Sequence, residues 1–94
     1  MNFRIAYHPL VPGRDLPKLS SFWLSEVERV IEEKLTMYPE VYGKPLSQSL
    51  KGYRKLRVGD YRAIFRIDQK TVKIFIIEHR SVVYKLVKQR LLGL

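Results

Sequence analysis

The sequence predicts an α+β fold, in which helices pack on a small antiparallel sheet made of an N-terminal strand and a three-strand meander. Two observations lead to this prediction. Apolar residues recur at helical spacing through the first half of the chain, and three short strand-like segments with two-residue connections fill the second half. A length of 94 residues favours one domain over residues 1–94.

The first half begins with alternation of apolar and polar residues over Asn2–His8, which predicts a strand. Prolines and a glycine follow and allow at most a short helical turn near Arg14–Leu19. Ser20 or Ser21 can cap a long helix, and Pro39 ends it. The apolar residues at helical spacing are Trp23, Leu24, Val27, Val30, Ile31, Leu35 and Tyr38.

The second half begins with a predicted loop over Val41–Lys51. The predicted meander strands are Tyr53–Val58, Tyr61–Asp68 and Thr71–His79. Gly59-Asp60 and Gln69-Lys70 separate them, and connections this short make consecutive strands antiparallel neighbours. Ser81 is expected to cap a final helix that carries Val83, Leu86 and Val87 on one stripe and ends at Gly93.

The composition excludes several classes of function. Without cysteine, disulfide frameworks, thiolate catalysis and cysteine-based zinc sites are impossible. With two histidines and few carboxylates in the second half, metal-free chemistry without a cofactor is expected. The longest apolar run, Ile74–Ile77, is too short to span a bilayer, and the N-terminus does not resemble a secretory signal. We therefore expect a cytoplasmic protein.

The positive charge is concentrated in one half of the chain. Residues 1–42 contain five Lys/Arg and six Asp/Glu, whereas residues 43–94 contain thirteen Lys/Arg and three Asp/Glu. Such an excess favours a polyanionic partner through phosphate attraction and counterion release. Ribosomal proteins, DNA-binding proteins and ribonucleases all share this property.

Six cations fall in a stretch of sixteen residues, 51–66, at the start of the predicted meander. They are the candidate nucleic-acid ligands. Strand alternation places Lys55 and Arg57 on an open face, with Leu56 and Val58 toward a core. A hairpin about Gly59-Asp60 brings Arg57 close to Arg62, and clustered cations favour an anionic ligand that offsets their repulsion. The six residues are Lys51, Arg54, Lys55, Arg57, Arg62 and Arg66.

A second group of polar residues follows the third meander strand. In an antiparallel meander, His79 and Arg80 lie near the start of the second strand, and Tyr84 follows one turn into the final helix. Lys55, Arg57 and Arg62 are therefore expected at the same sheet edge as His79, Arg80 and Tyr84.

Cleavage of RNA without a metal needs a base for the 2′-OH, cations for the phosphorane charge and an acid for the leaving 5′-oxygen. Histidine is the side chain that titrates near neutral pH, which makes His79 a candidate for proton transfer. Lys55 can act as a base where neighbouring cations favour its neutral form. Arg62 and Arg80 suit phosphate binding. Tyr84 could stack on a base or assist proton transfer.

The same residues resemble a known family. The stretch GKPLSQSLKGYRKLRVGDYRAIFRID, followed by IIEHRSVVY, resembles the core pattern of the RelE/ParE toxin superfamily. The opening FRIAYHPLV and the helix that ends before Pro39 also fit, so the resemblance covers nearly the whole chain. It implies a microbial-RNase-like fold, cleavage of mRNA in the ribosomal A site and a cognate antitoxin protein.

The resemblance also implies roles for individual residues. The family's catalytic positions fall on Lys55, Arg62, His79 and Arg80, with a C-terminal tyrosine at Tyr84. The RelE pattern has a second lysine where this chain has Tyr53, and the acidic base of YoeB-like members has no clear counterpart. His79 thereby gains weight as the general base. The residues expected to bind RNA are Lys51, Arg54, Arg57 and Arg66.

Three functions remain open at this point. The leading one is a ribosome-dependent, metal-independent endoribonuclease that acts as the toxin of a type II toxin–antitoxin pair. The second is a ParE-like inhibitor of DNA gyrase, which needs no proton-transfer residues. The third is a non-catalytic protein that binds nucleic acid by charge alone, with an affinity that falls steeply with salt.

Overall fold

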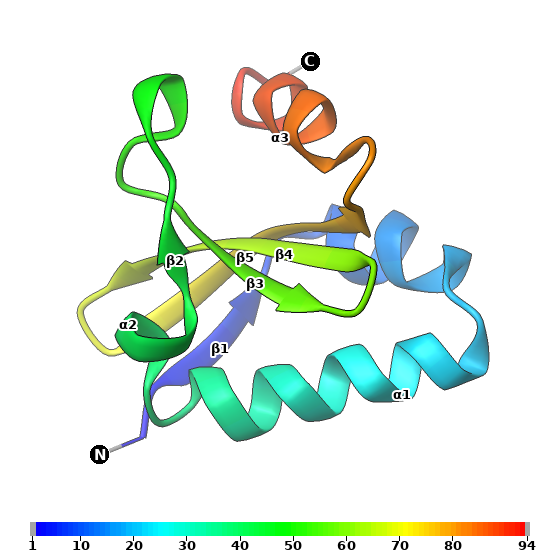
Figure 1. The fold of residues 1–94 in the computed structure, drawn as a ribbon, viewed down its shortest axis with the longest axis horizontal. Coiled ribbons are helices and arrows are strands. Elements are labelled where there is room, and N and C mark those ends of the chain that lie inside the picture. The colour runs from blue at the N-terminus through cyan, green and yellow to red at the C-terminus, as the bar shows by residue number, and fades with distance from the viewer. Residues whose placement is uncertain (1, 94) are drawn as a thin grey trace.

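The computed structural model describes residues 2–93 and has a five-stranded sheet at its centre (Figure 1). The strand order is β1-β5-β4-β3-β2. The strands are β1 (Arg4–Tyr7), β2 (Lys44–Pro45), β3 (Arg54–Val58), β4 (Tyr61–Asp68) and β5 (Thr71–His79).

Helices cover both faces of this sheet. The long helix α1 (Ser21–Val30) lies along one face, and α3 (Val83–Leu91) lies over the other (Figure 1). Ser20 caps α1, because its Oγ accepts a hydrogen bond from the Trp23 backbone N–H at 3.4 Å. Across the described residues, no helix has the length and apolar character needed to cross a membrane. The shorter helical segments are η1 (Val11–Asp15), η2 (Leu16–Lys18), η3 (Ile31–Leu35), α2 (Pro39–Tyr42) and η4 (Gln48–Leu50).

The predicted α+β class and the predicted meander are confirmed. β3, β4 and β5 pair antiparallel in sequence order, as their two-residue connections require. The sheet as a whole is mixed, because β1 runs parallel to β5, with Arg4 opposite Thr71 and Tyr7 opposite Ile74. The expectation of an all-antiparallel sheet was wrong here. No tight turn joins β1 to β5, so the length of the connection does not determine whether these two strands pair parallel or antiparallel.

Two local predictions also need correction. The predicted loop Val41–Lys51 contains a two-residue strand, β2, in which Lys44 pairs with Lys55 on β3. Ser81 does not cap the final helix. The N-cap is Val82, which makes no side-chain cap, whereas the Ser81 Oγ lies 2.8 Å from the His79 Nδ1.

The sheet separates two hydrophobic cores. On the α1 side, Leu56, Ala63 and Phe65 are buried against helix residues such as Val27 and Ile31. The smaller core on the α3 side is formed by Leu50, Ile64, Ile76, Val83 and Val87. The pairing of β4 with β5 shifts between Ile64 and Phe65, so Phe75 is an extra residue on β5.

A buried ion pair ties α3 to the sheet. The side chains of Asp15 and Arg90 are 0% and 7% exposed. Arg90 donates from both terminal nitrogens to the two Asp15 carboxylate oxygens, at 2.7 and 2.9 Å, and also to the Phe75 carbonyl at 2.9 Å. Asp15 Oδ2 additionally accepts the Ile77 backbone N–H at 2.9 Å. One carboxylate therefore connects η1, β5 and α3.

Replacing Asp15 is expected to destabilise the protein strongly. Asp15→Asn keeps the shape but leaves the Arg90 guanidinium buried without its counter-charge, which costs about 3–5 kcal/mol when one partner of a buried pair is lost. Urea denaturation at neutral pH measures this loss. The matched control is Lys73→Ala, which breaks a pair with Asp68 whose side chains are 41% and 49% exposed, and should cost under ~1 kcal/mol. Equal losses in both variants would contradict the role given to Asp15.

Candidate nucleic-acid interface

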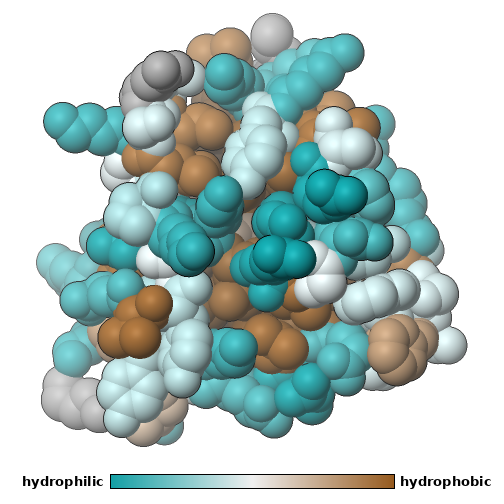
Figure 2. Space-filling view, viewed as in Figure 1, coloured by the Kyte–Doolittle hydropathy of each residue, from teal (hydrophilic) through white to brown (hydrophobic). Residues whose placement is uncertain are grey.

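Four cations line one pocket on the α3 side of the sheet. Lys44, Lys55, Arg57 and Arg62, with Tyr42, enclose about 170 Å³, and we call this pocket the basic cleft. Sheet register explains the clustering, because Lys44 pairs with Lys55 and Arg57 pairs with Arg62 across neighbouring strands. Hydrophilic side chains gather over the middle of the sheet in the space-filling view (Figure 2).

The basic cleft carries positive charge that the protein itself does not compensate. Within residues 2–93, no carboxylate forms an ion pair with Lys44, Lys55 or Arg57. Arg62 donates from Nη1 to the Gly59 and Tyr61 carbonyls, both at 2.9 Å, which fixes its guanidinium near the β3–β4 turn. Like charges about 4 Å apart repel by roughly 1 kcal/mol even in water. A bound phosphate would offset this repulsion.

Tyr84 forms part of the surroundings of the cleft. It lies on the first turn of α3, packs against the smaller core, and has its ring 5.8 Å from the Lys55 Nζ. A lysine over an aromatic face is a favourable cation–π arrangement. The structure thus brings together Lys55, Arg57, Arg62 and Tyr84, all of which the sequence singled out.

His79 and Arg80 reach the same end of the sheet, but the His79 ring lies on the other side. Tyr61 pairs with His79 in the sheet, and their rings are 5.9 Å apart. Tyr61 packs against the α1-side core, whereas its neighbour Arg62 lines the basic cleft. Arg80 is held at the β3–β4 turn, with its backbone N–H on the Asp60 carbonyl at 2.8 Å and its Nε 3.5 Å from Asp60 Oδ1.

The His79 ring is held by the residue two positions later. Its Nδ1 lies 2.8 Å from the Ser81 Oγ and 3.2 Å from the Ser81 backbone nitrogen. A ring that donates Nδ1–H to the Ser81 Oγ leaves a lone pair on Nε2 that can take a proton. The Ser81 N–H would instead stabilise the opposite tautomer. Ser81 therefore occupies Nδ1, and Nε2 can take a proton only in the tautomer that carries its hydrogen on Nδ1.

Three cations that the sequence assigned to RNA lie outside the basic cleft. Arg54 is on the opposite face of β3 and donates to the carbonyls of Glu40 and Gly43, at 3.3 and 2.8 Å. Arg66 lies four residues beyond Arg62 on β4, roughly 13 Å along the strand. Its guanidinium stacks on the rings of Tyr53 and Phe75, at 5.6 and 5.8 Å. Lys51 is exposed in the turn before β3.

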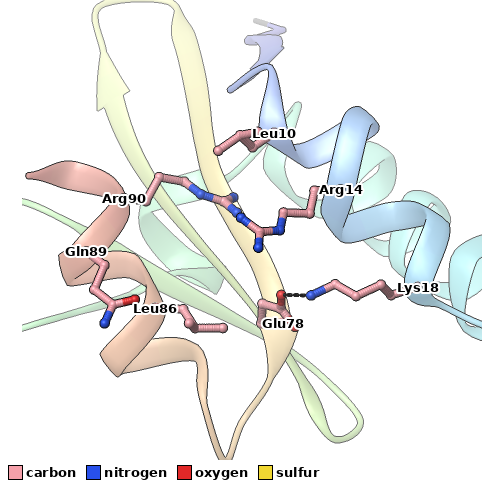
Figure 3. Close-up of a pocket in the computed structure, with 7 residues that line it drawn as sticks. All are labelled: Leu10, Arg14, Lys18, Glu78, Leu86, Gln89 and Arg90. Carbon is pink, nitrogen blue, oxygen red and sulfur yellow. Dashed lines mark hydrogen bonds and ion pairs between the residues drawn. The ribbon is translucent and has the colours of Figure 1, made fainter. Parts of the chain in front are cut away.

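Sequence reasoning missed Tyr42 and Lys44 in the cleft. Lys44 falls in the loop that the sequence predicts over Val41–Lys51, and only the pairing of β2 with β3 places it beside Lys55. It also missed a second pocket, of about 250 Å³, between the N-terminal helical turns and α3 (Figure 3). In the described part of the chain, no three His, Cys, Asp or Glu residues are grouped so as to hold a metal ion.

Comparisons with known proteins agree on one family. A family profile described as "ParE toxin of type II toxin-antitoxin system, parDE" matches residues 23–84. The chain is 38% identical to Toxin RelG of Mycobacterium tuberculosis over 74 residues, covering 77% of this chain and 85% of that protein. It is 33% identical to Toxin RelE of the same organism over 85 residues, covering 85% and 88%.

Solved structures give the same result. The RelBE2 toxin–antitoxin complex of Mycobacterium tuberculosis contains a chain with a TM-score of 0.79 and 33% identity, covering 85% of this chain and all of that one. A free mutant of RelE from E. coli has the same fold at 19% identity, with a TM-score of 0.71 and coverage of 96% and 98%. The chain therefore belongs to the RelE/ParE superfamily of type II toxin–antitoxin toxins.

Proposed function

We propose that this toxin is a ribosome-dependent endoribonuclease that cleaves mRNA in the A site by attack of a 2′-OH on the adjacent phosphodiester. The observation that carries the proposal is the basic cleft, in which Lys44, Lys55, Arg57 and Arg62 converge without a compensating carboxylate in the described chain. Preorganised cations of this kind stabilise the charge that develops on a phosphorane. A cleft without a proton-transfer group would bind RNA but would not cleave it.

The proton-transfer groups are assigned from what each side chain can donate or accept. The His79 Nε2 takes the proton of the 2′-OH in the tautomer whose Nδ1–H donates to the Ser81 Oγ. Lys55 gives a proton to the leaving 5′-oxygen. The products are a 2′,3′-cyclic phosphate and a free 5′-hydroxyl, and the proton taken by His79 balances the one given by Lys55. Arg57, Arg62 and Arg80 bind phosphate, and Tyr84 positions the Lys55 ammonium.

We further infer that a cognate antitoxin binds this chain. The related RelBE2 toxin was solved with its antitoxin, as were RelE-type toxins from Methanococcus jannaschii and Pyrococcus horikoshii. The uncompensated cations of the basic cleft are complementary to the carboxylates of such a partner. Co-purification of the toxin with the product of a short neighbouring gene tests this inference.

Arg62→Ala is expected to lower the rate of mRNA cleavage on programmed ribosomes about 100- to 1000-fold, because a preorganised donor to the developing charge is lost. The measurement is the appearance of A-site cleavage products by primer extension. Lys88→Ala, which removes an exposed cation on α3, is the matched control and should stay within about threefold of the wild-type rate. An equal loss of cleavage rate in both variants would mean that the cleft acts only through nonspecific electrostatic attraction.

Single-turnover cleavage on programmed ribosomes tests the base. His79→Gln should lower the rate at least about 100-fold, because the group that takes the 2′-OH proton is lost. Ser81→Ala should lower the rate about tenfold without changing ribosome affinity, since Ser81 acts by positioning the ring. A His79→Gln rate within about threefold of the wild-type rate would contradict the assignment of His79 as the base.

A ParE-like gyrase inhibitor is the second candidate, because the matching family profile is named for ParE. A DNA supercoiling assay with purified gyrase separates the two functions. The nuclease proposal expects no inhibition at toxin concentrations that cleave mRNA completely. Inhibition of supercoiling together with intact ribosome-bound mRNA would favour the gyrase inhibitor over the nuclease.

A further inference from the structure

The second pocket lies apart from the basic cleft and shares none of its residues. The end of β5, the α3 helix and the N-terminal segment η1–η2 enclose it, as Figure 3 shows. We call it the Arg14 pocket. Its lining residues are Leu10, Arg14, Lys18, Glu78, Leu86, Gln89 and Arg90. The proposed nuclease chemistry uses none of these side chains.

Two of the three cations in this pocket already have a counter-charge. Arg90 is held by the buried Asp15, with both carboxylate oxygens in contact. Lys18 pairs with Glu78 at 2.5 Å. The Arg14 side chain forms no hydrogen bond or ion pair with any residue in the described range 2–93. The pocket therefore has one uncompensated positive charge.

The arrangement around Arg14 favours a small oxyanion. The guanidinium groups of Arg14 and Arg90 point toward one another across the pocket (Figure 3). Arg90 cannot turn away, because Asp15 and the Phe75 carbonyl hold it. A bound anion between the two would receive charge-assisted hydrogen bonds from Arg14 and reduce the repulsion. Gln89 lines the same pocket and adds an amide donor.

We propose that the Arg14 pocket binds one carboxylate side chain of the cognate antitoxin. The proposal rests on the antitoxin partner inferred above and is independent of whether the target is mRNA or gyrase. A single uncompensated charge matches a single carboxylate. Leu10 and Leu86 provide apolar walls for the methylene groups of a Glu or Asp side chain. Arginine anchors in recessed, partly apolar pockets are typical of protein–protein interfaces.

An RNA phosphate fits these observations less well. An RNA backbone carries one charge per nucleotide and is usually bound by rows of exposed cations. The basic cleft offers such a row, with four cations on adjacent strands. The Arg14 pocket instead places the Glu78 carboxylate in its wall, next to the strand that carries Arg62. RNA binding at Arg14 is therefore an outcome that the test must detect.

The first test measures antitoxin affinity. Arg14→Ala is expected to raise the Kd for the cognate antitoxin about 10- to 100-fold, the loss of one charge-assisted hydrogen bond, and Arg14→Glu should raise it further. Arg4→Ala and Arg4→Glu are the matched controls, because Arg4 is an exposed arginine on β1 that does not line the pocket. Urea midpoints should be unchanged in all four variants, which shows that they fold.

The second test identifies the carboxylate by charge exchange. Each Asp and Glu of the antitoxin is changed to Arg, and each variant is titrated against the Arg14→Glu toxin. The proposal is supported if one antitoxin substitution raises the affinity for the Arg14→Glu toxin at least about tenfold and has no such effect on the Arg4→Glu toxin. Failure of every position to restore binding overturns it.

The remaining outcomes separate this proposal from the others. Arg14→Glu could bind the antitoxin as tightly as the wild type does and bind a single-stranded RNA oligonucleotide more weakly. That result would make the pocket an RNA site and overturn the proposal. No binding of the antitoxin by the wild-type toxin would refute the inferred partner itself. Loss of mRNA cleavage in Arg62→Ala bears on the nuclease function alone, since Arg62 does not line the Arg14 pocket.

Discussion

The buried carboxylate of Asp15 joins three elements, η1, β5 and α3, on the α3 side of the molecule. β1 pairs with β5 only as far as Ile74, so the following edge of β5 has no strand beside it. The Asp15 carboxylate accepts the Ile77 N–H there, and Arg90 donates to the Phe75 carbonyl. An ion pair thus replaces the missing backbone partners. Because buried polar groups without partners are costly, this pair both closes the sheet edge and holds α3 against it. Tyr84 lies on the same helix, so its place beside Lys55 depends on the same contact.

The extra residue in β5 determines which side chains share a face. Without it, strict alternation would place Ile76 and Ile74 on the same side of the sheet. With Phe75 as an extra residue, Ile76 joins the α3-side core and Ile77 the α1-side core. The same shift brings Glu78 opposite Arg62 and His79 opposite Tyr61. Any substrate that meets both Arg62 and His79 must therefore lie across the end of the sheet, where the β3–β4 turn brings Arg62 and Arg80 together.

Much of this architecture could be predicted because short-range patterns determine it. Helical spacing located α1, and two-residue connections determined the meander and hence the Arg57–Arg62 pairing. The remaining features depend on long-range contacts that leave no local pattern. The sense of β1 depends on a strand nearly seventy residues away, and Lys44 enters the cleft only because β2 pairs with β3. The Asp15–Arg90 contact joins residues 75 positions apart. Arg54 shows the opposite case. The charge pattern predicts that it binds RNA, but its guanidinium donates a hydrogen bond to the Gly43 carbonyl on the opposite face of β3.

The distribution of charge in space differs from its distribution along the sequence. The first half of the chain is nearly neutral, yet it contributes Arg14 and Lys18 to the α3 side. Glu26 on α1 and Glu33 on η3 both pair with Arg29 at the surface. The α3 side therefore carries the uncompensated cations of the basic cleft and Arg14, and these attract a polyanion to that side. The basic cleft and the Arg14 pocket both lie on that side, on either side of the Glu78–Arg62 register pair. A partner anchored at Arg14 would thus occupy the face that RNA must approach, so a single carboxylate contact can set the orientation in which the antitoxin excludes RNA.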